Sequence, residues 1–508
     1  MKLKFWKKDP PPVRIEPKLD ETEPVTQSRG KMAPTIKQRN YDSTVMSRIT
    51  ADWTAAPAHI DQIIFNNLRV LVARSRDRFI NDDYGKRFVS LVKANVVGPN
   101  GFGLESRAVG NDEKPDQAAT VAIEKAWKSY KKKTNCDVTG RHSFTELNQL
   151  IIGTIVVDGE ALIRYHRSGH YGQQLELIDP QKLDVNYNDT LEDGRYIRFG
   201  IEYNARGRVL AYHLSQPSGI ANIYLASYNT RNYERVPAGE MDHLFIPIFA
   251  EQKRGIPWMA TSLVRMKMLG GFEDASLVAA RAGASKMGFF TVPAGDDYQP
   301  GEKDETGAVI SEFEPGTFEE LPEGVQMQSF DPQYPAGEFD MFMKSCLRGI
   351  ASGFGVDYVS LANNLEGVNY SSLRHGELLN RELWKAMQQW LIENWLNDFM
   401  ERWIIEQYQR STITIKGRPL SRKLQNYLPH RWQGRRWEWV DPLKDMNAKL
   451  IEYKMGVTSI SQIIRERGRD PEEIWREREK EDKRMKELGI EPGQMLGFVV
   501  SEGEKNAE

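Results

Sequence analysis

The chain has 508 residues, with 69 basic and 71 acidic side chains and a formal net charge of −2. This length exceeds what one hydrophobic core supports, so several subdomains are expected, and the charge balance does not by itself demand a nucleic-acid partner. Two cysteines far apart in sequence argue against a disulfide framework and favour assembly in a reducing cytoplasm, and no apolar run reaches the ~20 residues of a membrane span.

The chain begins with a basic arm followed by helices. Residues 1–45 are rich in Lys, Arg and Pro and poor in aliphatic side chains, which predicts a flexible arm. Whether the arm also touches nucleic acid or a partner stays open. Apolar residues at helical spacing predict helices over 60–72, 84–96 and 116–130, and a capping-box pattern at 143–146 starts a fourth.

The next part is predicted to be rich in strands. Short β-branched and aromatic runs alternate with turn signals as far as residue 248. Strands over 196–203 and 208–214 flank Asn204-Ala-Arg-Gly207, a hairpin signal in which glycine can adopt positive φ. We expect a mixed α+β unit and no independent enzyme domain.

A long helix is predicted over residues 256–290, and its second half consists mainly of small side chains. Small residues let neighbouring helices approach closely. The neighbour can be another helix of the same chain or the same helix of a second copy, and the pattern leaves both open. The small residues of interest are Ala275, Ala279, Ala282 and Gly283.

An acidic insert follows, at 291–335. Residues 296–340 contain thirteen acidic side chains and one lysine. A solvated surface explains such a bias, and so does docking to a basic partner or repulsion of a polyanion. Apolar pieces at 308–310 and 324–327 predict a small strand pair.

Three further elements complete the helical frame. A return helix is predicted over 336–355, a mobile Gly/Asn-rich loop over 356–372, and a Trp-rich helix over 373–408. We interpret the Trp-rich stripe as core packing. Residues 410–440 mix basic and aromatic side chains, which can bind single strands by stacking or can pack inward with the charges solvated. Helices are predicted over 441–455, 459–467 and 471–488.

None of the common catalytic motifs occurs. The sequence has no G-x-x-x-x-G-K-[ST] phosphate loop, no G-x-G-x-x-G after a strand, no H-E-x-x-H and no G-x-S-x-G. The eight histidines do not cluster at ligand spacing. We therefore expect no enzyme activity, no catalytic residue, no metal site and no cofactor.

Several motifs occur together in one order along about residues 50–490. The most specific are Arg254-Gly-Ile-Pro-Trp258, Leu347-Arg-Gly-Ile-Ala351, Val368-Asn-Tyr-Ser-Ser-Leu-Arg374 and Trp437-Glu-Trp-Val-Asp-Pro442, preceded by Val96-Val-Gly-Pro-Asn-Gly-Phe102 and Leu175-Glu-Leu-Ile-Asp-Pro180. On these motifs the chain resembles the lambda-type family of tailed-phage portal proteins, the head–tail connectors.

The resemblance implies a mainly helical α+β fold of wing, stem, clip and crown. It implies a ring of twelve copies around a channel at one capsid vertex of the virion, assembled in the host cytoplasm. In chain order it implies a basic arm (1–45), wing (46–255), stem helix 1 (256–290), acidic clip (291–335), stem helix 2 (336–355), tunnel loop (356–372), further wing (373–440), crown (441–490) and flexible tail (491–508).

The resemblance also implies roles for particular residues. The clip acids that would dock terminase and then neck proteins are Glu302, Asp304, Glu305, Glu312, Glu314, Glu319 and Glu320. The tunnel loop would use Asn363, Asn364, Glu366, Gly367 and Asn369. Lys344 and Arg348 would line the channel, although packing or ion pairing explains them equally well. The subunit seam would contain Ala275, Ala279, Ala282 and Gly283.

The implied function is passage of double-stranded DNA during packaging and ejection. The implied partners are further copies of the chain, DNA, terminase, capsid and scaffold proteins, and head–tail completion proteins, with no membrane and no small-molecule substrate. The alternative is a nucleic-acid-processing enzyme or accessory factor that uses the basic and aromatic segment 410–440.

Overall fold

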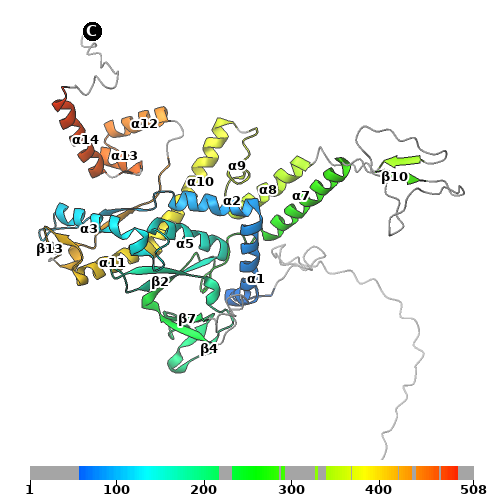
Figure 1. The fold of residues 1–508 in the computed structure, drawn as a ribbon, viewed down its shortest axis with the longest axis horizontal. Helices are drawn as coiled ribbons and strands as arrows, with labels where there is room; N and C mark the ends of the chain where they lie inside the picture. The colour runs from blue at the N-terminus through cyan, green and yellow to red at the C-terminus, as the bar shows by residue number, and fades with distance from the viewer. Residues whose placement is uncertain are drawn as a thin grey trace, which may run out of the picture. The chain divides into compact units, whose positions relative to one another are not determined.

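The computed structural model describes residues 56–216, 232–284, 288–291, 326–329, 339–367, 369–420, 423–437, 442–467, 469 and 471–489. The fold below belongs to the unit Ala58–Glu508 (Figure 1). Helices predominate, and short antiparallel sheets lie among them. The expected class, a mainly helical α+β fold, is confirmed.

The first helices follow the predicted pattern. They are α1 (Ile60–Asn81), α2 (Asp83–Val92), α3 (Gln117–Tyr130), α4 (Lys133–Cys136) and α5 (Phe144–Asp158). A π-helical turn, Lys93–Val97, extends α2. The capping box is present at the start of α5, where the Ser143 side chain accepts from the Glu146 amide and the Glu146 carboxylate accepts from the Ser143 amide.

Two antiparallel sheets follow α5. The first has the order β3-β2-β9 and the second β4-β5-β6-β7-β8. Their strands are β2 (Glu160–His166), β3 (Gln174–Ile178), β4 (Asp189–Thr190), β5 (Tyr196–Arg198), β6 (Ile201–Tyr203), β7 (Val209–Ser215), β8 (Tyr233–Pro237) and β9 (Met241–Phe245). The hairpin predicted around Gly207 is confirmed as β6–β7, with Gly207 at φ +81°.

The single strand predicted over 196–203 is wrong. Phe199 and Gly200 both have positive φ, at 55° and 77°, and the chain reverses there into two paired strands, β5 and β6. Two consecutive residues with positive φ form the tight turn that matches the twist of a hairpin. The positive φ of Gly200 therefore belongs to the turn that reverses the chain between β5 and β6.

The helix predicted over 256–290 is too long at both ends. The observed helix α7 is Leu263–Ala284, and Gly288–Thr291 forms strand β10, paired with β11 (Gln326–Ser329). At the start, a Cβ on Gly255 would lie 2.1 Å from the Gly159 carbonyl oxygen, and the Trp258 amide donates to Val156 at 3.1 Å. Packing on the α5–β2 junction therefore holds this segment out of a helix. A strand pair was predicted between 308–310 and 324–327. The second strand is present as β11, but it pairs with β10, and 308–310 lies outside the described residues.

The return helix α8 (Phe339–Phe354) ends as predicted and runs beside α7 (Figure 1). The loop predicted over 356–372 contains a short helix, α9 (Tyr358–Ala362), because the Asp357 side chain caps it by accepting from the Ser360 amide at 2.6 Å. Helix α10 (Tyr370–Leu391) also begins earlier than predicted.

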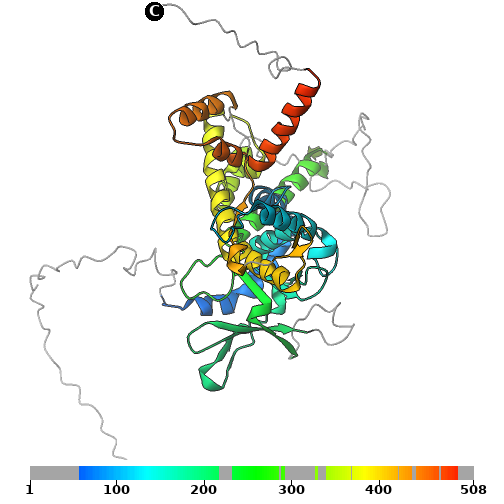
Figure 2. The ribbon, with the colours of Figure 1, turned by 90° about the vertical axis from the view of Figure 1, so that its left-hand side faces the viewer.

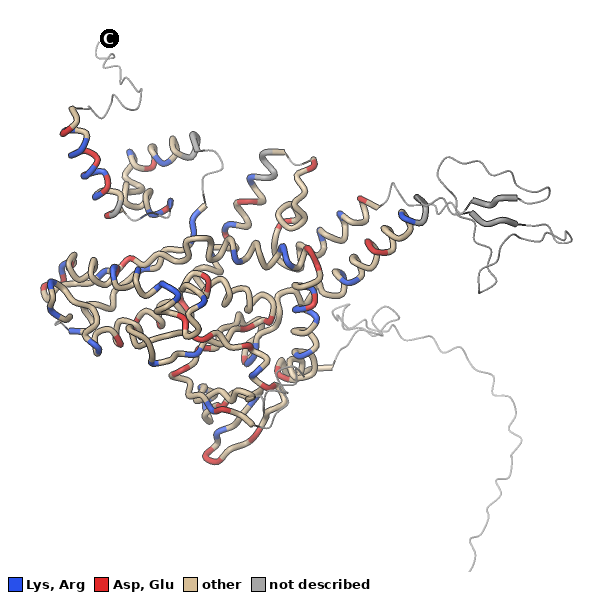
Figure 3. The backbone as a smooth tube through the Cα atoms, viewed as in Figure 1, with Lys and Arg blue, Asp and Glu red and all other residues tan. Residues whose placement is uncertain are grey.

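The remaining elements complete the unit. Helix α10 continues through a π-helical turn, Ile392–Leu396, into α11 (Asn397–Arg410), and the three form one long helical run (Figure 2). Later elements are β12 (Thr414–Ile415), β13 (Arg418–Pro419), β14 (His430–Gln433), α12 (Pro442–Lys454), α13 (Ile460–Glu466) and α14 (Pro471–Glu487); β14 pairs with β1 (Gly103–Ser106). Acidic and basic residues are interspersed along α14 (Figure 3), as expected of a solvated helix.

The main core lies between α3, α5 and the α10–α11 run. Trp395 and Trp403 are fully buried, and the Trp127 ring meets the Trp403 ring edge-on at 5.5 Å. Aromatic pairs in this arrangement contribute about 1 kcal/mol beyond their buried area. The interpretation of the Trp-rich stripe as core is confirmed.

Candidate functional site along α7, α8 and the following loop

Helix α7 has a buried face and an exposed apolar face. Leu263, Met266 and Leu269 follow one another at spacings of three residues and are buried. Val264 and Met268 are 70% and 71% exposed. Val278, ten residues after Met268, is 64% exposed and lies on the same side of the helix, with Gly271 and Ala275 between them on that side. Large apolar side chains in a row on a solvent face mark a surface for another chain.

The small residues predicted for a subunit seam lie on or beside this face. Ala275 is exposed between Met268 and Val278, and Ala279 is half-buried at the edge of the face. Ala282 and Gly283 lie near the end of α7. The helix includes both, but their surroundings lie outside the described residues.

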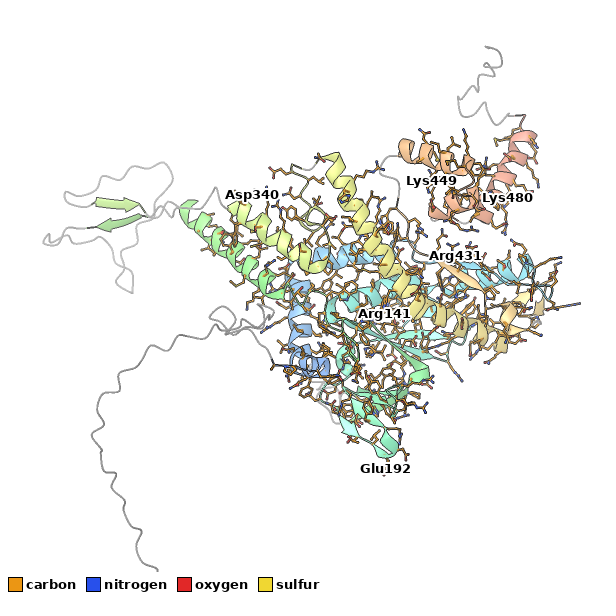
Figure 4. The ribbon with its side chains drawn as sticks, turned by 180° about the vertical axis from the view of Figure 1, so that it is seen from behind. Arg141, Glu192, Asp340, Arg431, Lys449 and Lys480 are labelled. Atoms are coloured by element: carbon orange, nitrogen blue, oxygen red, sulfur yellow. The ribbon has the colours of Figure 1, made fainter. Side chains whose placement is uncertain are left out.

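Lys344 on α8 is paired with two carboxylates. Its Nζ lies 2.6 Å from Asp340, in the first turn of α8 (Figure 4), and 3.0 Å from Glu366, in the loop beyond α9. These hydrogen bonds raise the pKa of Lys344, first through Asp340 and then through Glu366. The lysine thus connects α8 to the predicted tunnel loop.

Arg348 lies one turn further along α8 and is exposed. Its guanidinium carbon is 5.5 Å from the centre of the Tyr358 ring on α9. A cation over an aromatic face at an exposed site is worth about 0.5–1 kcal/mol. Both predicted channel cations therefore also contact α9 or the loop after it.

Side-chain hydrogen bonds order the predicted tunnel loop. Asn363 ends α9 with φ of 52°. Asn364 accepts from the Glu366 amide at 2.8 Å and donates to the Tyr358 hydroxyl at 3.1 Å. Gly367 has φ of 69°, and Asn369 also makes an interaction. The structure pairs one residue of this loop, Glu366, with Lys344 on α8.

The predicted docking acids are not placed by the structure. Glu302, Asp304, Glu305, Glu312, Glu314, Glu319 and Glu320 all lie outside the described residues. Their role stays a prediction.

Sequence reasoning missed a buried ion pair at the approach to α7. Arg254 and Glu160 are each 2% exposed, and Arg254 Nε lies 2.9 Å from both Glu160 oxygens. His243 Nε2 lies 2.9 Å from the same carboxylate, and the Gly255 amide donates to it at 2.9 Å. Burial alone would raise the pKa of Glu160, but Arg254 and His243 together lower it to about 2.

Arg254 also donates to carbonyl groups of the second sheet region. Its Nη1 contacts the carbonyl oxygens of Leu183 at 2.9 Å and Phe199 at 3.1 Å. One side chain therefore joins both sheets to the segment that leads into α7. The motif Arg254-Gly-Ile-Pro-Trp258 was the available signal, although nothing in it identifies the partner.

The aromatic residues of segment 410–440 mostly pack inward. Trp432 is buried and meets Trp127 edge-on at 5.5 Å. Trp437 is half-buried and donates to Asn95 Oδ1 at 2.9 Å. The Trp432 ring is therefore closed to base stacking. The alternative of a nucleic-acid-processing enzyme or accessory factor that uses segment 410–440 stays a prediction. Trp439 lies outside the described residues.

In the part of the chain that the structure describes, no group of three His, Cys, Asp or Glu side chains is placed to hold a metal ion. No helix among the same residues is long and apolar enough to cross a membrane.

Comparisons with known proteins define the class. A family model described as phage portal protein, lambda family, matches residues 46–388. The probable portal protein of Halomonas phage phiHAP-1 is 33% identical over 469 residues, which cover 91% of this chain and 89% of that protein. Portal protein B of Escherichia phage lambda is 22% identical, with 87% of this chain and 88% of that protein covered.

Solved structures give a weaker likeness. The neck of a native gene transfer agent particle, computed with C12 symmetry, has a TM-score of 0.42 and 12% identity, covering 78% of this chain and 92% of that chain. A structure of the virion of the native particle has a TM-score of 0.44 and 12% identity, and the match covers 82% of this chain and 100% of that chain.

The sequence matches place the chain among the structural proteins of tailed phages. The chain belongs to the lambda family of phage portal proteins.

Proposed function

We propose that the chain assembles into a ring of twelve copies at one vertex of a phage capsid. The ring surrounds the channel through which double-stranded DNA enters during packaging and leaves at ejection. Family membership over most of the chain carries this proposal. The chain acts as a conduit and docking platform. The packaging motor that binds the ring hydrolyses ATP.

The exposed face of α7 supports the ring. Val264, Met268 and Val278 present apolar side chains around the small Ala275, so the face has both apolar area and room for a close neighbour. In a cyclic assembly each copy uses one surface to meet a different surface of the next copy. The α7 face is the first of these two surfaces.

The α8 end and its loop support a channel constriction. Lys344 and Arg348 give each copy two cations next to a hydrogen-bonded loop. Rotational repetition turns these side chains into a ring of cations in which each Lys344 is paired with Asp340 and Glu366, and DNA phosphates meet this ring as they pass. The acidic insert, with thirteen acids and one lysine over 296–340, supplies the docking surface for terminase and then for neck proteins.

A packaging assay tests the function. Capsids assembled with the chain should protect genome-length DNA from nuclease once motor and ATP are added. Capsids assembled without it should protect none. Equal protection in the two preparations would refute a portal role.

A further inference from the structure

An exposed aromatic side chain projects from the loop that follows β9. Phe249 is 57% exposed, and its neighbour Ile248 is exposed as well. The buried side chain of Gln252 holds this loop from inside, because its Oε1 accepts from the Ile248 amide at 2.9 Å and from the Phe249 amide at 3.2 Å. Its Nε2 donates to the Arg254 carbonyl at 2.7 Å. The loop therefore presents Phe249 on a backbone that is held in place.

Polar contacts fasten the same loop to the start of α1. Glu251 lies 3.1 Å from His59 Nε2, and Lys253 Nζ lies 2.5 Å from Asp61. The Glu251 side chain stays largely exposed, so its carboxylate can accept a further partner. The loop thus offers an apolar ring and, two residues later, a negative charge.

A pocket of about 300 Å³ lies at the other end of α1, where α1 meets α2 and α5 (Figure 1). Phe79 in its lining follows Asp61 by eighteen residues, which is roughly 27 Å along the helix. Ile80 at its rim is 72% exposed. Most of the lining is apolar, and its apolar members are Phe79, Ile80, Val89, Leu150 and Val157. We call it the α1–α5 pocket.

The α1–α5 pocket contains a lysine that has no ion-pair partner among the described residues. Lys93 lies across α5, where a Cβ on Gly153 would be 2.2 Å from Lys93 Cε, and its Nζ lies 6.0 Å from the centre of the Phe79 ring. The Asp158 carboxylate in the lining is occupied by Arg76, through two hydrogen bonds of 2.7 Å. Burial lowers the pKa of Lys93. A carboxylate brought here from outside would therefore favour the charged lysine.

We propose that Phe249 of one copy inserts into the α1–α5 pocket of a second copy, which places Glu251 beside Lys93. A cavity of about 150 Å³ already accepts benzene, so the pocket has room for a phenyl group. Closed assemblies form when one surface of each copy meets a different surface of the next, and the loop and the pocket are two such surfaces. This contact deepens the proposed ring assembly and rests on it.

A second copy is favoured over an unrelated protein because this chain supplies both halves of the contact. The loop carries an apolar ring followed by a carboxylate, and the pocket has apolar walls beside a lysine. Within one copy the two halves are held apart, because the loop is fastened to the first turn of α1 and the pocket lies at the last turns. Copies that each carry both halves therefore join head to tail.

Cysteine crosslinking tests this contact in the assembled full-length protein. Phe249→Cys with Ile80→Cys is oxidised and run on a non-reducing gel beside the two single variants, which account for the native Cys136 and Cys346. The control pair is Phe249→Cys with Val121→Cys, because Val121 is an exposed apolar residue of α3. We expect a ladder of crosslinked copies from the first pair alone. The two single variants, when co-expressed, should give dimers and no larger species.

A charge exchange tests the second half of the contact. Glu251→Lys and Lys93→Glu each bring like charges together, so each should lower the assembled fraction on gel filtration about tenfold. The double variant should restore assembly, because it rebuilds the pair with the signs exchanged. Glu192→Lys, in an exposed turn before β5, is the control and should assemble normally. Circular dichroism checks that every variant is folded.

Rings that form without the crosslink, or that give an equal ladder with the control pair, would overturn the contact and leave the portal function intact. A crosslink within one copy, seen as a faster-moving monomer, would overturn it too. Assembly that both single charge variants leave unchanged would also overturn it and would assign the pocket to a different protein. A chain that stays monomeric under all conditions would contradict the contact and the proposed ring together.

Discussion

Arg254 and Glu160 lie 94 residues apart in sequence and form a buried, bidentate ion pair at the junction of both sheets and α7. Removing one partner leaves the other charge buried without compensation, which is more costly than losing an exposed pair. This pair therefore connects the sheet region to the pair of helices formed by α7 and α8.

Arg254→Leu should lower the free energy of unfolding by about 3–5 kcal/mol. Urea denaturation of the purified protein measures the change. Lys483→Gln is the control, because Lys483 pairs with Glu479 on the solvated α14 and exposed pairs contribute at most about 1 kcal/mol. A similar loss of unfolding free energy in the two variants would show that the buried pair contributes no more than an exposed pair.

Acidification should reduce the contribution of the Arg254–Glu160 pair to the free energy of unfolding. The pKa of Glu160 is about 2, below its usual 4.5, so its contribution is fully present above pH ~5 and disappears as pH falls through 4.5 toward 2. A shift of this size corresponds to about 3 kcal/mol. Glu160→Gln should be less stable than the wild type at neutral pH, and the gap should narrow toward pH ~3. A gap independent of pH would contradict this assignment.

Reversing the two cations of α8 should impair DNA packaging. In Lys344→Glu with Arg348→Glu, the pairing with Asp340 and Glu366 becomes repulsion, and a proposed ring in which these four charges balance becomes strongly negative. Rings should still form, and nuclease-protected DNA should fall at least about tenfold. Arg206→Glu with Arg208→Glu is the matched control. Normal packaging by the α8 variant would exclude a channel role for these residues.

A bulky residue on the α7 face should block ring closure. Ala275→Trp places an indole between Met268 and Val278, and Ala275 is fully on the exposed face, whereas Ala279 lies at its edge. The variant should stay folded by circular dichroism and run as a monomer on gel filtration. Ala205→Trp, in the exposed β6–β7 turn, should form rings. Intact rings from Ala275→Trp would assign this face to something other than the subunit seam.

Local features were predictable from the sequence. The capping box at Ser143, the hairpin at Gly207 and the buried stripe around Trp395 each depend on residues close together in the chain. Their physics is local: orphan helix amides, positive φ and helical periodicity.

Contacts between distant residues were not predictable in the same way. The Arg254–Glu160 pair and the contact of Arg435 with Asn95, 340 residues away, leave no periodic trace. The predicted helix over 256–290 failed for this reason too, because Gly255 packs against Gly159 and the tertiary contact overrides local preference. Of the candidate site, the helix faces were predictable, and the pairing of Lys344 with Glu366 was not.

The most direct test of the ring and channel is a cryo-electron microscopy map of the purified full-length protein. It should show a closed ring with an open central channel, the α7 face of each copy buried against the next copy, and Lys344 and Arg348 facing the lumen. A chain that stays monomeric at high concentration, or a ring with the α7 face exposed to solvent and both cations away from the lumen, would contradict the account.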